Sequence, residues 1–264
     1  TENPNAVLCI VIALLCSFVA SALAGLIYSF LTITLKANQN VTGLTITIFG
    51  SGIANFYGGY LNKLAGGVGQ ISVSSTSTAF RTMLPFATTT GNIGKILFSY
   101  GFMVYLAVIL AIVVQYFFNT RKGLALRAVG EDPATADAAG INVTKYKYVA
   151  TCLGAGISGL GGTYYVMDYI KGTWANDGKL ESLGWLAVAL VIFATWKPVK
   201  SVWGAYLFGL IYWMYLYIPN LTRSSQELFK MMPYVVTLVV LIISSLRKKR
   251  EQQPPASLGL AYFR

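Results

Sequence analysis

The 264-residue chain has no histidine and only three cysteines, Cys9, Cys16 and Cys152. Without histidine it lacks the commonest metal ligand and the side chain that most often acts as a general base. The cysteines lie in apolar runs without metal-site spacing and are interpreted as small buried hydrophobic residues. The sequence also has no paired carboxylates and no nucleophile beside a base. We therefore predict neither a metal site nor catalytic residues.

Charge is also scarce, because only 11% of the residues are charged and 55% are hydrophobic. Soluble domains average about 25% charged residues. The deficit predicts that most of the chain lies in lipid, where helices satisfy every backbone polar group internally. The net charge of +11 lies mainly in loops beside apolar runs. We interpret it as a signal of membrane orientation and expect no nucleic-acid partner.

Seven apolar runs predict an all-α, polytopic integral membrane protein with about seven visible transmembrane helices. They fall near 6–35, 41–58, 99–118, 146–167, 183–196, 201–218 and 232–246. Strict alternation places thirteen of the 20 lysines and arginines on one side, which we assign to the cytoplasm. The prediction is a single transmembrane domain over 1–264 with an outer N-terminus and a cytoplasmic tail, 247–264. Because the first residue is not Met, we expect further spans upstream.

One inner loop carries the signature of a short helix over 132–140. Asp132 suits the N-cap, Pro133 the first helical position and Gly140 the residue just past the end. Such a helix on the inner face of a membrane protein suggests a docking element for a cytoplasmic partner.

Polar side chains enter the second apolar run directly and glycines interrupt it. Spans of this kind often line a transport path. The alternative is that the threonines bond back to their own helix and the asparagines act as caps. The candidate path residues are Asn38, Asn40, Thr42, Thr45, Thr47 and Asn55.

Small residues recur along the run 146–167. Residues 154–159 match the G-x-G-x-x-G pattern of dinucleotide sites, but no strand precedes them, so we reject that reading. The spacing instead predicts a groove for a neighbouring helix. The proposed packing residues are Gly154, Ser158, Gly159 and Gly162.

The sequence also lacks a G-x-x-x-x-G-K-[ST] motif. The chain therefore cannot bind ATP through such a loop, and energy from ATP must enter through another subunit.

Several segments resemble permease subunits of ABC importers, in the branch that takes up nucleosides, ribose-type sugars and branched-chain amino acids. The resemblance is carried by 123–143, 145–147 and 154–162. The stretch 37–50 and the tail 255–264 look most like the nucleoside permeases linked to basic membrane proteins. One departure is that the Asn-Ile-Gly-x-Glu-Gly-type motif of the family's first spans is absent.

The resemblance implies that the helix near 132–140 is a coupling helix seated in a cytoplasmic ABC ATPase. ATP and magnesium would bind to that ATPase, and this chain would hold no cofactor. The other implied partners are a second permease, alike or paralogous, an outer substrate-binding lipoprotein or soluble protein, and the lipid of the plasma membrane. The expected docking residues are Glu131, Asp132, Ala134, Ala136, Asp137, Ala138, Gly140 and Ile141.

The leading hypothesis is therefore a nucleoside importer permease. Importers of ribose, branched-chain amino acids or riboflavin remain alternatives, as does a secondary transporter that works without ATP. The last alternative predicts a titratable residue near the membrane midplane, and the seven runs contain none in their interiors.

Overall fold

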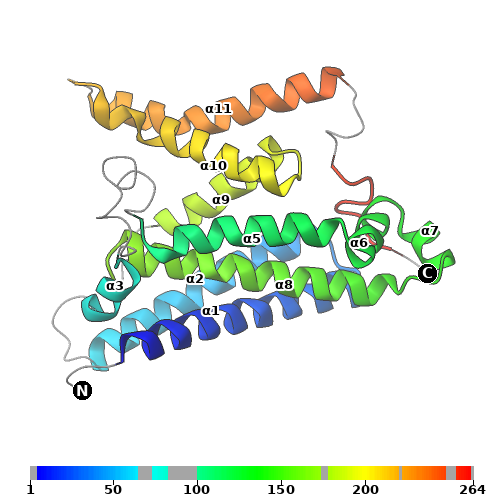
Figure 1. Cartoon of the computed structure of the whole chain (residues 1–264), viewed down its shortest axis with the longest axis horizontal. Coiled ribbons are helices and arrows are strands. Elements are labelled where there is room, and N and C mark those ends of the chain that lie inside the picture. The colour runs from blue at the N-terminus through cyan, green and yellow to red at the C-terminus, as the bar shows by residue number, and fades with distance from the viewer. Residues whose placement is uncertain are drawn as a thin grey trace. The chain divides into compact units, whose positions relative to one another are not determined.

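The computed structural model describes residues 5–64, 73–82, 100–173, 178–219, 222–247 and 254–262. Within these residues the regular structure is helical (Figure 1). Contacts divide the chain into two compact units, and each is described by itself. Unit 1 comprises Thr1–Ala107, Asp132–Asp177 and Gly259–Arg264, and unit 2 comprises Val108–Glu131 and Gly178–Leu258.

The seven predicted apolar runs correspond to seven long helices among the described residues. They are α1 (Ala6–Ser29), α2 (Gln39–Leu64), α5 (Phe102–Phe118), α8 (Val143–Tyr164), α9 (Lys179–Phe193), α10 (Pro198–Trp213) and α11 (Arg223–Arg247). Shorter helices are α3 (Ser74–Phe80), α6 (Arg121–Glu131) and α7 (Pro133–Ala138). Wider or tighter turns follow three long helices, namely η1 (Phe30–Thr34), η3 (Tyr165–Tyr169) and η4 (Met214–Tyr217).

Two segments are by themselves long and apolar enough to cross a membrane, Val7–Thr34 and Ser224–Ile243. A third candidate is the pair α5 and α6, which is bent by 81°. Helices α9 and α10 have 15 and 16 residues. At 1.5 Å per residue they are roughly 23 Å long, shorter than the ~30 Å hydrocarbon core. The chain is an all-α membrane protein, and its short helices need a tilt or a thinned bilayer to span it.

Unit 1 is organised around α1 and α8, which run side by side (Figure 1). Their direction follows from contacts at three levels. Ser17 of α1 meets Gly159 of α8, Gly25 meets Ala155, and the hydroxyl of Thr34 bonds that of Tyr148. Because the position rises along α1 as it falls along α8, the two helices are antiparallel.

The far end of α8 is fixed within unit 1 by α3. Ser77 donates its hydroxyl to the carbonyl of Met167 at 2.7 Å, and Val73 donates its amide to the carbonyl of Gly172 at 2.9 Å. Gly172 has φ +73, and an added Cβ would lie 2.9 Å from the Val73 carbonyl oxygen. Only glycine satisfies both conditions.

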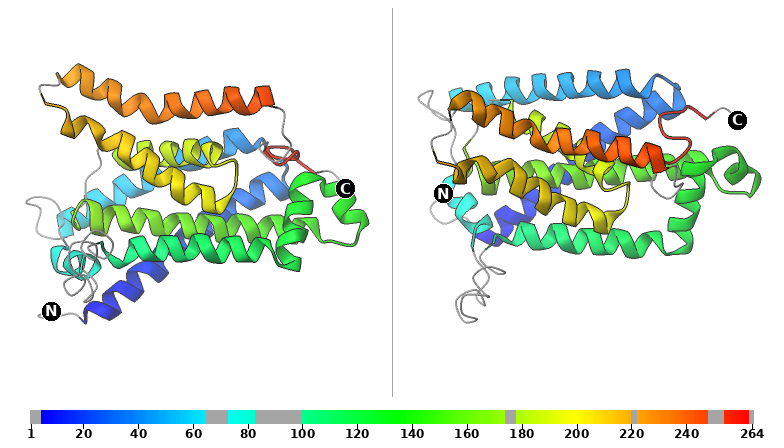
Figure 2. Two further views of the ribbon diagram at one scale, coloured as in Figure 1. Left: turned by 45° about the horizontal axis from the view of Figure 1, so that its top comes forward. Right: turned by 90° about the horizontal axis from the view of Figure 1, so that it is seen from above.

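Unit 2 contains α9, α10 and α11, which contact one another (Figure 2). Phe193 packs against Phe208 with ring centroids 5.1 Å apart, and Tyr234 donates to the carbonyl of Ser182 at 3.3 Å. The last run, expected to be short, extends to a 25-residue helix that includes Pro233.

Two polar segments of the sequence lie largely outside the described residues. Most of the polar outer loop 59–98 lies in 65–72 and 83–99, and most of the basic cluster 247–250 lies in 248–253. The tail is described from 254 to 262. Its residues 255–257 lie against α6 within unit 2, where the Ser257 amide donates to the carbonyl of Gly130 at 3.1 Å.

Candidate coupling site and substrate path

Helix α7 begins at a well-formed cap. One carboxylate oxygen of Asp132 accepts the amides of Ala134 and Thr135 at 3.0 and 3.3 Å. The other accepts the Thr135 hydroxyl. These bonds lower the pKa of the Asp132 carboxyl below its usual value, and the bond from the Thr135 hydroxyl has the largest effect. The predicted roles of Asp132 and Pro133 are confirmed.

The end of α7 is equally defined by local bonds. Gly140 has φ +83 and donates its amide to the carbonyl of Asp137 at 2.9 Å. The Ile141 amide donates to the carbonyl of Ala136 at 3.0 Å. This pair of bonds is the Schellman motif, in which a glycine in the left-handed region ends the helix. The prediction for Gly140 is confirmed.

A second cap follows at once, at a residue that was not among the predicted caps. The side chain of Asn142 accepts the Lys145 amide at 2.9 Å and starts α8. The signal was available, since Asn is a favoured N-cap and stands just before the apolar run. Residues 132–142 thus form a short helix with its own start and stop, joined to the next helix without a flexible linker.

The side chains of α7 divide between an inner and an outer face. Ala136 is 3% exposed and Val143, which follows the helix, is also 3% exposed. Asp137 and Ile141 are half-buried, whereas Ala134, Ala138 and Gly140 are exposed, as are Glu131 and Asp132. Of the eight expected docking residues, Ala136 therefore serves the packing of unit 1, whereas Ala134, Ala138 and Gly140 lie on the exposed side of the helix.

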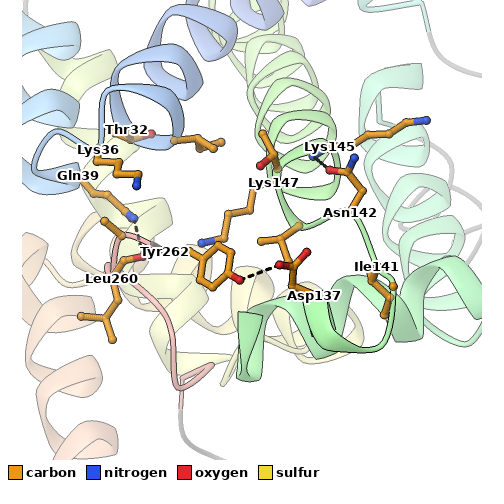
Figure 3. Close-up of a pocket in the computed structure, with 15 residues that line it drawn as sticks. Thr32, Lys36, Gln39, Asp137, Ile141, Asn142, Lys145, Lys147, Leu260 and Tyr262 are labelled. Carbon is orange, nitrogen blue, oxygen red and sulfur yellow. Dashed lines mark hydrogen bonds between the residues drawn. The ribbon is translucent and has the colours of Figure 1, made fainter. Parts of the chain in front are cut away.

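The inner side of α7 is held by the C-terminal segment of unit 1 (Figure 3). Tyr262 donates its hydroxyl to the carboxylate of Asp137 at 3.1 Å. The ammonium of Lys147 lies 6.0 Å from the centre of the Tyr262 ring, and Gln39 donates to the carbonyl of Leu260 at 3.4 Å. The tail therefore connects α7 with the first turns of α2 and α8.

The candidate path residues occupy different positions on α2. Asn38 is a cap, because its side chain accepts the amides of Asn40 and Val41 at 3.0 and 3.2 Å. Thr42 is 7% exposed and bonds the carbonyl of Asn38. Thr45 bonds the Val41 carbonyl. These contacts agree with the alternative interpretation, in which hydroxyls and amides serve their own helix.

Three of the candidates share one exposed side of α2. At 100° per residue, Asn40, Thr47 and Asn55 fall within an arc of about 80°, and all three are exposed. Leu44, 51% exposed, falls on the same arc, and Ile48, 73% exposed, lies about 20° beyond its edge. Thr47 donates its hydroxyl to the carbonyl of Gly43, which leaves both lone pairs of its oxygen as acceptors. This face combines amides and a hydroxyl with aliphatic side chains.

Helix α1 contacts α8 at one of the two registers of small residues predicted for helix packing. At Gly159 an added Cβ would lie 2.6 Å from Ser21 Cβ, and the Gly159 carbonyl accepts the Ser17 hydroxyl at 2.7 Å. At Gly154 and Gly162 no described atom lies within 4 Å of an added Cβ. Ser158 is exposed. Helix α1 meets the face of α8 that carries Gly159 and Gly156 and leaves the other stripe uncovered.

The long apolar helices, joined by a self-capped short helix, are those of a polytopic membrane protein. The chain matches the family described as the branched-chain amino acid transport system permease component over residues 3–241. It belongs to this family.

Relatives in the same family carry more specific names. The putative glucose ABC transporter permease protein TsgC13 of Haloferax volcanii is 35% identical over 70% of this chain and 54% of its own length. The nucleoside ABC transporter permease protein NupC of Lactococcus lactis is 30% identical over 84% of this chain and 71% of its own. The guanosine ABC transporter permease protein NupQ of Bacillus subtilis is 30% identical over 86% and 71%. The chain thus spans about half of the haloarchaeal relative and seven tenths of the other two. No solved structure matches.

Proposed function

We propose that this permease is a membrane subunit of an ATP-driven importer for nucleosides. It lies in the plasma membrane with the C-terminus inside, beside a second permease, and receives solute from an outer binding protein. A cytoplasmic ABC ATPase supplies the energy, binding ATP and magnesium. The observation that carries the proposal is α7, a doubly capped helix with exposed alanines in a member of a permease family.

The exposed surface of α7 suits a closely fitted partner. Ala134 and Ala138 are exposed and small, so a groove in the ATPase can approach the helix backbone. Glu131, Asp132 and Gly140 add polar groups and a bare backbone at the edges. Because α7 ends in fixed turns at both sides, a displacement of the helix is passed to α8 rather than absorbed in a loop.

The choice of nucleosides is supported by the exposed face of α2. Asn40 and Asn55 offer amide donors and acceptors to ribose hydroxyls, and Leu44 and Ile48 offer aliphatic surface to a base. Glucose is the second candidate, since one relative is named for it. A sugar without a base has less use for the aliphatic part of this face.

A secondary transporter is disfavoured by the positions of the carboxylates. Among the described residues of the long helices, Glu181 lies in the first turn of α9 and Glu227 near the start of α11. Asp168 lies past the end of α8. None occupies the middle of a described span, where ion coupling needs a titratable group.

Purification from the native membrane tests the proposal directly. The tagged chain should retain an ABC ATPase and an outer binding protein in mild detergent, and the binding protein should release a nucleoside on denaturation. Isolation of the chain alone in several mild detergents would contradict the importer assignment. A released hexose would keep the importer and change its substrate.

Replacing Asn40 by leucine should impair transport without affecting assembly. The loss of an amide on the exposed α2 face removes hydrogen bonds to the solute, and uptake of labelled nucleoside at low concentration should fall about tenfold. Asn119→Leu, the same change at an exposed residue between α5 and α6, is the matched control. Wild-type uptake by the Asn40 variant would remove this residue from the path.

The cap of α7 should weaken in acid. The pKa of Asp132 is lowered in the folded chain, so the carboxylate stabilises the helix start above its ordinary pKa, and this stabilisation is lost as pH falls through the folded value. The protection factors of the Ala134 and Thr135 amides, measured by hydrogen exchange and corrected for intrinsic rates, should drop below about pH 4. Asp132→Ala should lower them roughly fivefold at neutral pH, with Asp132→Asn close to wild type. Protection that is independent of both pH and the side chain would contradict the assigned role of the cap.

A further inference from the structure

Unit 1 contains a cavity of about 640 Å³ at the end where α1 stops and α2 and α8 begin (Figure 3). Its wall comes from four segments: the η1 turn, the start of α2, residues 137–147, and residues 260–262 of the tail. The volume falls within the range of small-molecule sites, about 300–1,000 Å³. It is therefore large enough for a polar headgroup.

The charge of the wall is positive. In Figure 3 the amino groups of Lys36 and Lys147 point into the space beside Tyr262, and Lys145 points away from it. Lys36 stands in the left-handed region with φ +55, which fixes its backbone at the turn between η1 and α2. The single carboxylate of the wall, Asp137, accepts the Tyr262 hydroxyl. The lining residues therefore include three lysines and one carboxylate, which gives the wall a net positive charge.

The start of α8 adds to the positive potential. Val143, Thr144 and Lys145 of its first turn line the cavity, and this helix is 22 residues long. The N-terminus of a helix carries partial positive charge and favours anions. Since the lysines and the helix end converge on one cavity, the site is built for a negatively charged group.

The position of the cavity indicates which kind of molecule would bring the negatively charged group. The membrane-crossing segment Val7–Thr34 ends at it, so the cavity lies at the boundary between hydrocarbon and water. Ile33, Val143 and Leu260 give its wall an apolar part. A basic pocket between span ends, with both polar and apolar walls, matches a phospholipid headgroup and its glycerol.

We propose that this cavity binds the phosphate of an anionic phospholipid headgroup, held between Lys36 and Lys147. The lipid would fill the space between the tail and the first turn of α8 and so support the inner side of α7. This role is independent of the transported solute, and its test needs no transport measurement.

Native mass spectrometry of the purified full chain with its partner subunits tests the site. Phosphatidylglycerol and phosphatidylcholine of equal chain length are titrated separately, and the Kd of the first bound lipid is measured. Phosphatidylglycerol should bind at least tenfold more tightly. The double variant Lys36→Gln/Lys147→Gln should weaken its binding about tenfold or more, because each lysine near an anionic lipid contributes about 1 kcal/mol.

A second pair of lysines provides the control. Lys122→Gln/Lys200→Gln removes the same charge from exposed residues of unit 2 and should leave the Kd of the first lipid unchanged. Lys36→Gln alone, at an exposed position, should still weaken binding about fivefold. Lys147→Arg should retain binding. Equal losses in both double variants, or equal affinity for the two lipids, would overturn the proposal.

Glycerol 1-phosphate separates a lipid from a soluble phosphate. If it leaves bound phosphatidylglycerol in place at millimolar concentration, the lipid assignment holds. If it displaces the lipid from wild type at micromolar concentration but does not do so in Lys36→Gln/Lys147→Gln, the site binds free phosphate and the lipid assignment is overturned.

Discussion

An arginine at position 138 is expected to abolish the stimulation of ATP hydrolysis by substrate while the permease still inserts and folds. Ala138 is exposed on α7, in the last helical position, so the larger side chain does not disturb unit 1. It does prevent a partner from approaching the helix backbone. Loss of close packing together with a buried, unpaired charge at an interface is expected to reduce coupling by a factor on the order of 100.

The measurement is the ATPase rate of the reconstituted complex with and without solute-loaded binding protein. Ala138→Ser, which keeps the residue small, serves as the control and should couple normally. Full coupling in the arginine variant would show that the ATPase docks elsewhere, even if the ATPase co-purifies with the chain.

The second large effect is expected at the contact between α1 and α8. In Gly159→Ala the new Cβ would lie 2.9 Å from the Ser17 carbonyl oxygen and 2.6 Å from Ser21 Cβ. A backbone atom cannot yield as a flexible side chain does, so the two helices must separate. Overpacking of this kind costs about 1–3 kcal/mol. The melting temperature of the purified chain in detergent should fall by several degrees.

The same helix offers a matched control. Gly154→Ala adds the same methyl group where no described atom lies within 4 Å. Alanine is the better helix former by about 1 kcal/mol, so this variant should melt at the wild-type temperature or slightly above it. The melting temperature is obtained by heating samples to a series of temperatures and measuring the remaining monodisperse fraction by size-exclusion chromatography. Equal melting temperatures for the two variants would contradict the assigned register of α1 on α8.

The features predictable from sequence are those determined by neighbouring residues. Asp132, Pro133 and Gly140 lie within nine positions of one another, and caps and turns act over that range. The seven long helices follow from apolar runs for the same reason. The choice between two faces of α8 was not predictable, since Gly154, Ser158 and Gly162 recur every four residues, as do Ala155 and Gly159. Only the partner helix selects between them.

The contacts of the tail could not be predicted from the sequence for a different reason. Tyr262 and Asp137 are 125 positions apart, and neither is unusual in its local sequence. The path residues show the intermediate case. Their polarity distinguishes α2 from the other apolar runs, but a threonine that bonds its own helix and one that faces a solute look alike in a sequence. The structure reduces the six candidates to Asn40, Thr47 and Asn55, because these three are exposed on one side of the helix.

Because α7 has a defined cap at each end, the segment that contains it can be exchanged between related proteins. Residues 132–142 carry their own start, their own stop and the cap of the following helix, so these eleven residues define where the short helix begins and ends. An exchange of this segment between related permeases would preserve the geometry of the junction and change only the exposed side chains. If α7 is the proposed docking helix, such chimeras would pair one permease with the ATPase of another. The capping residues Asp132, Gly140 and Asn142 should be transferred together with the exposed side chains.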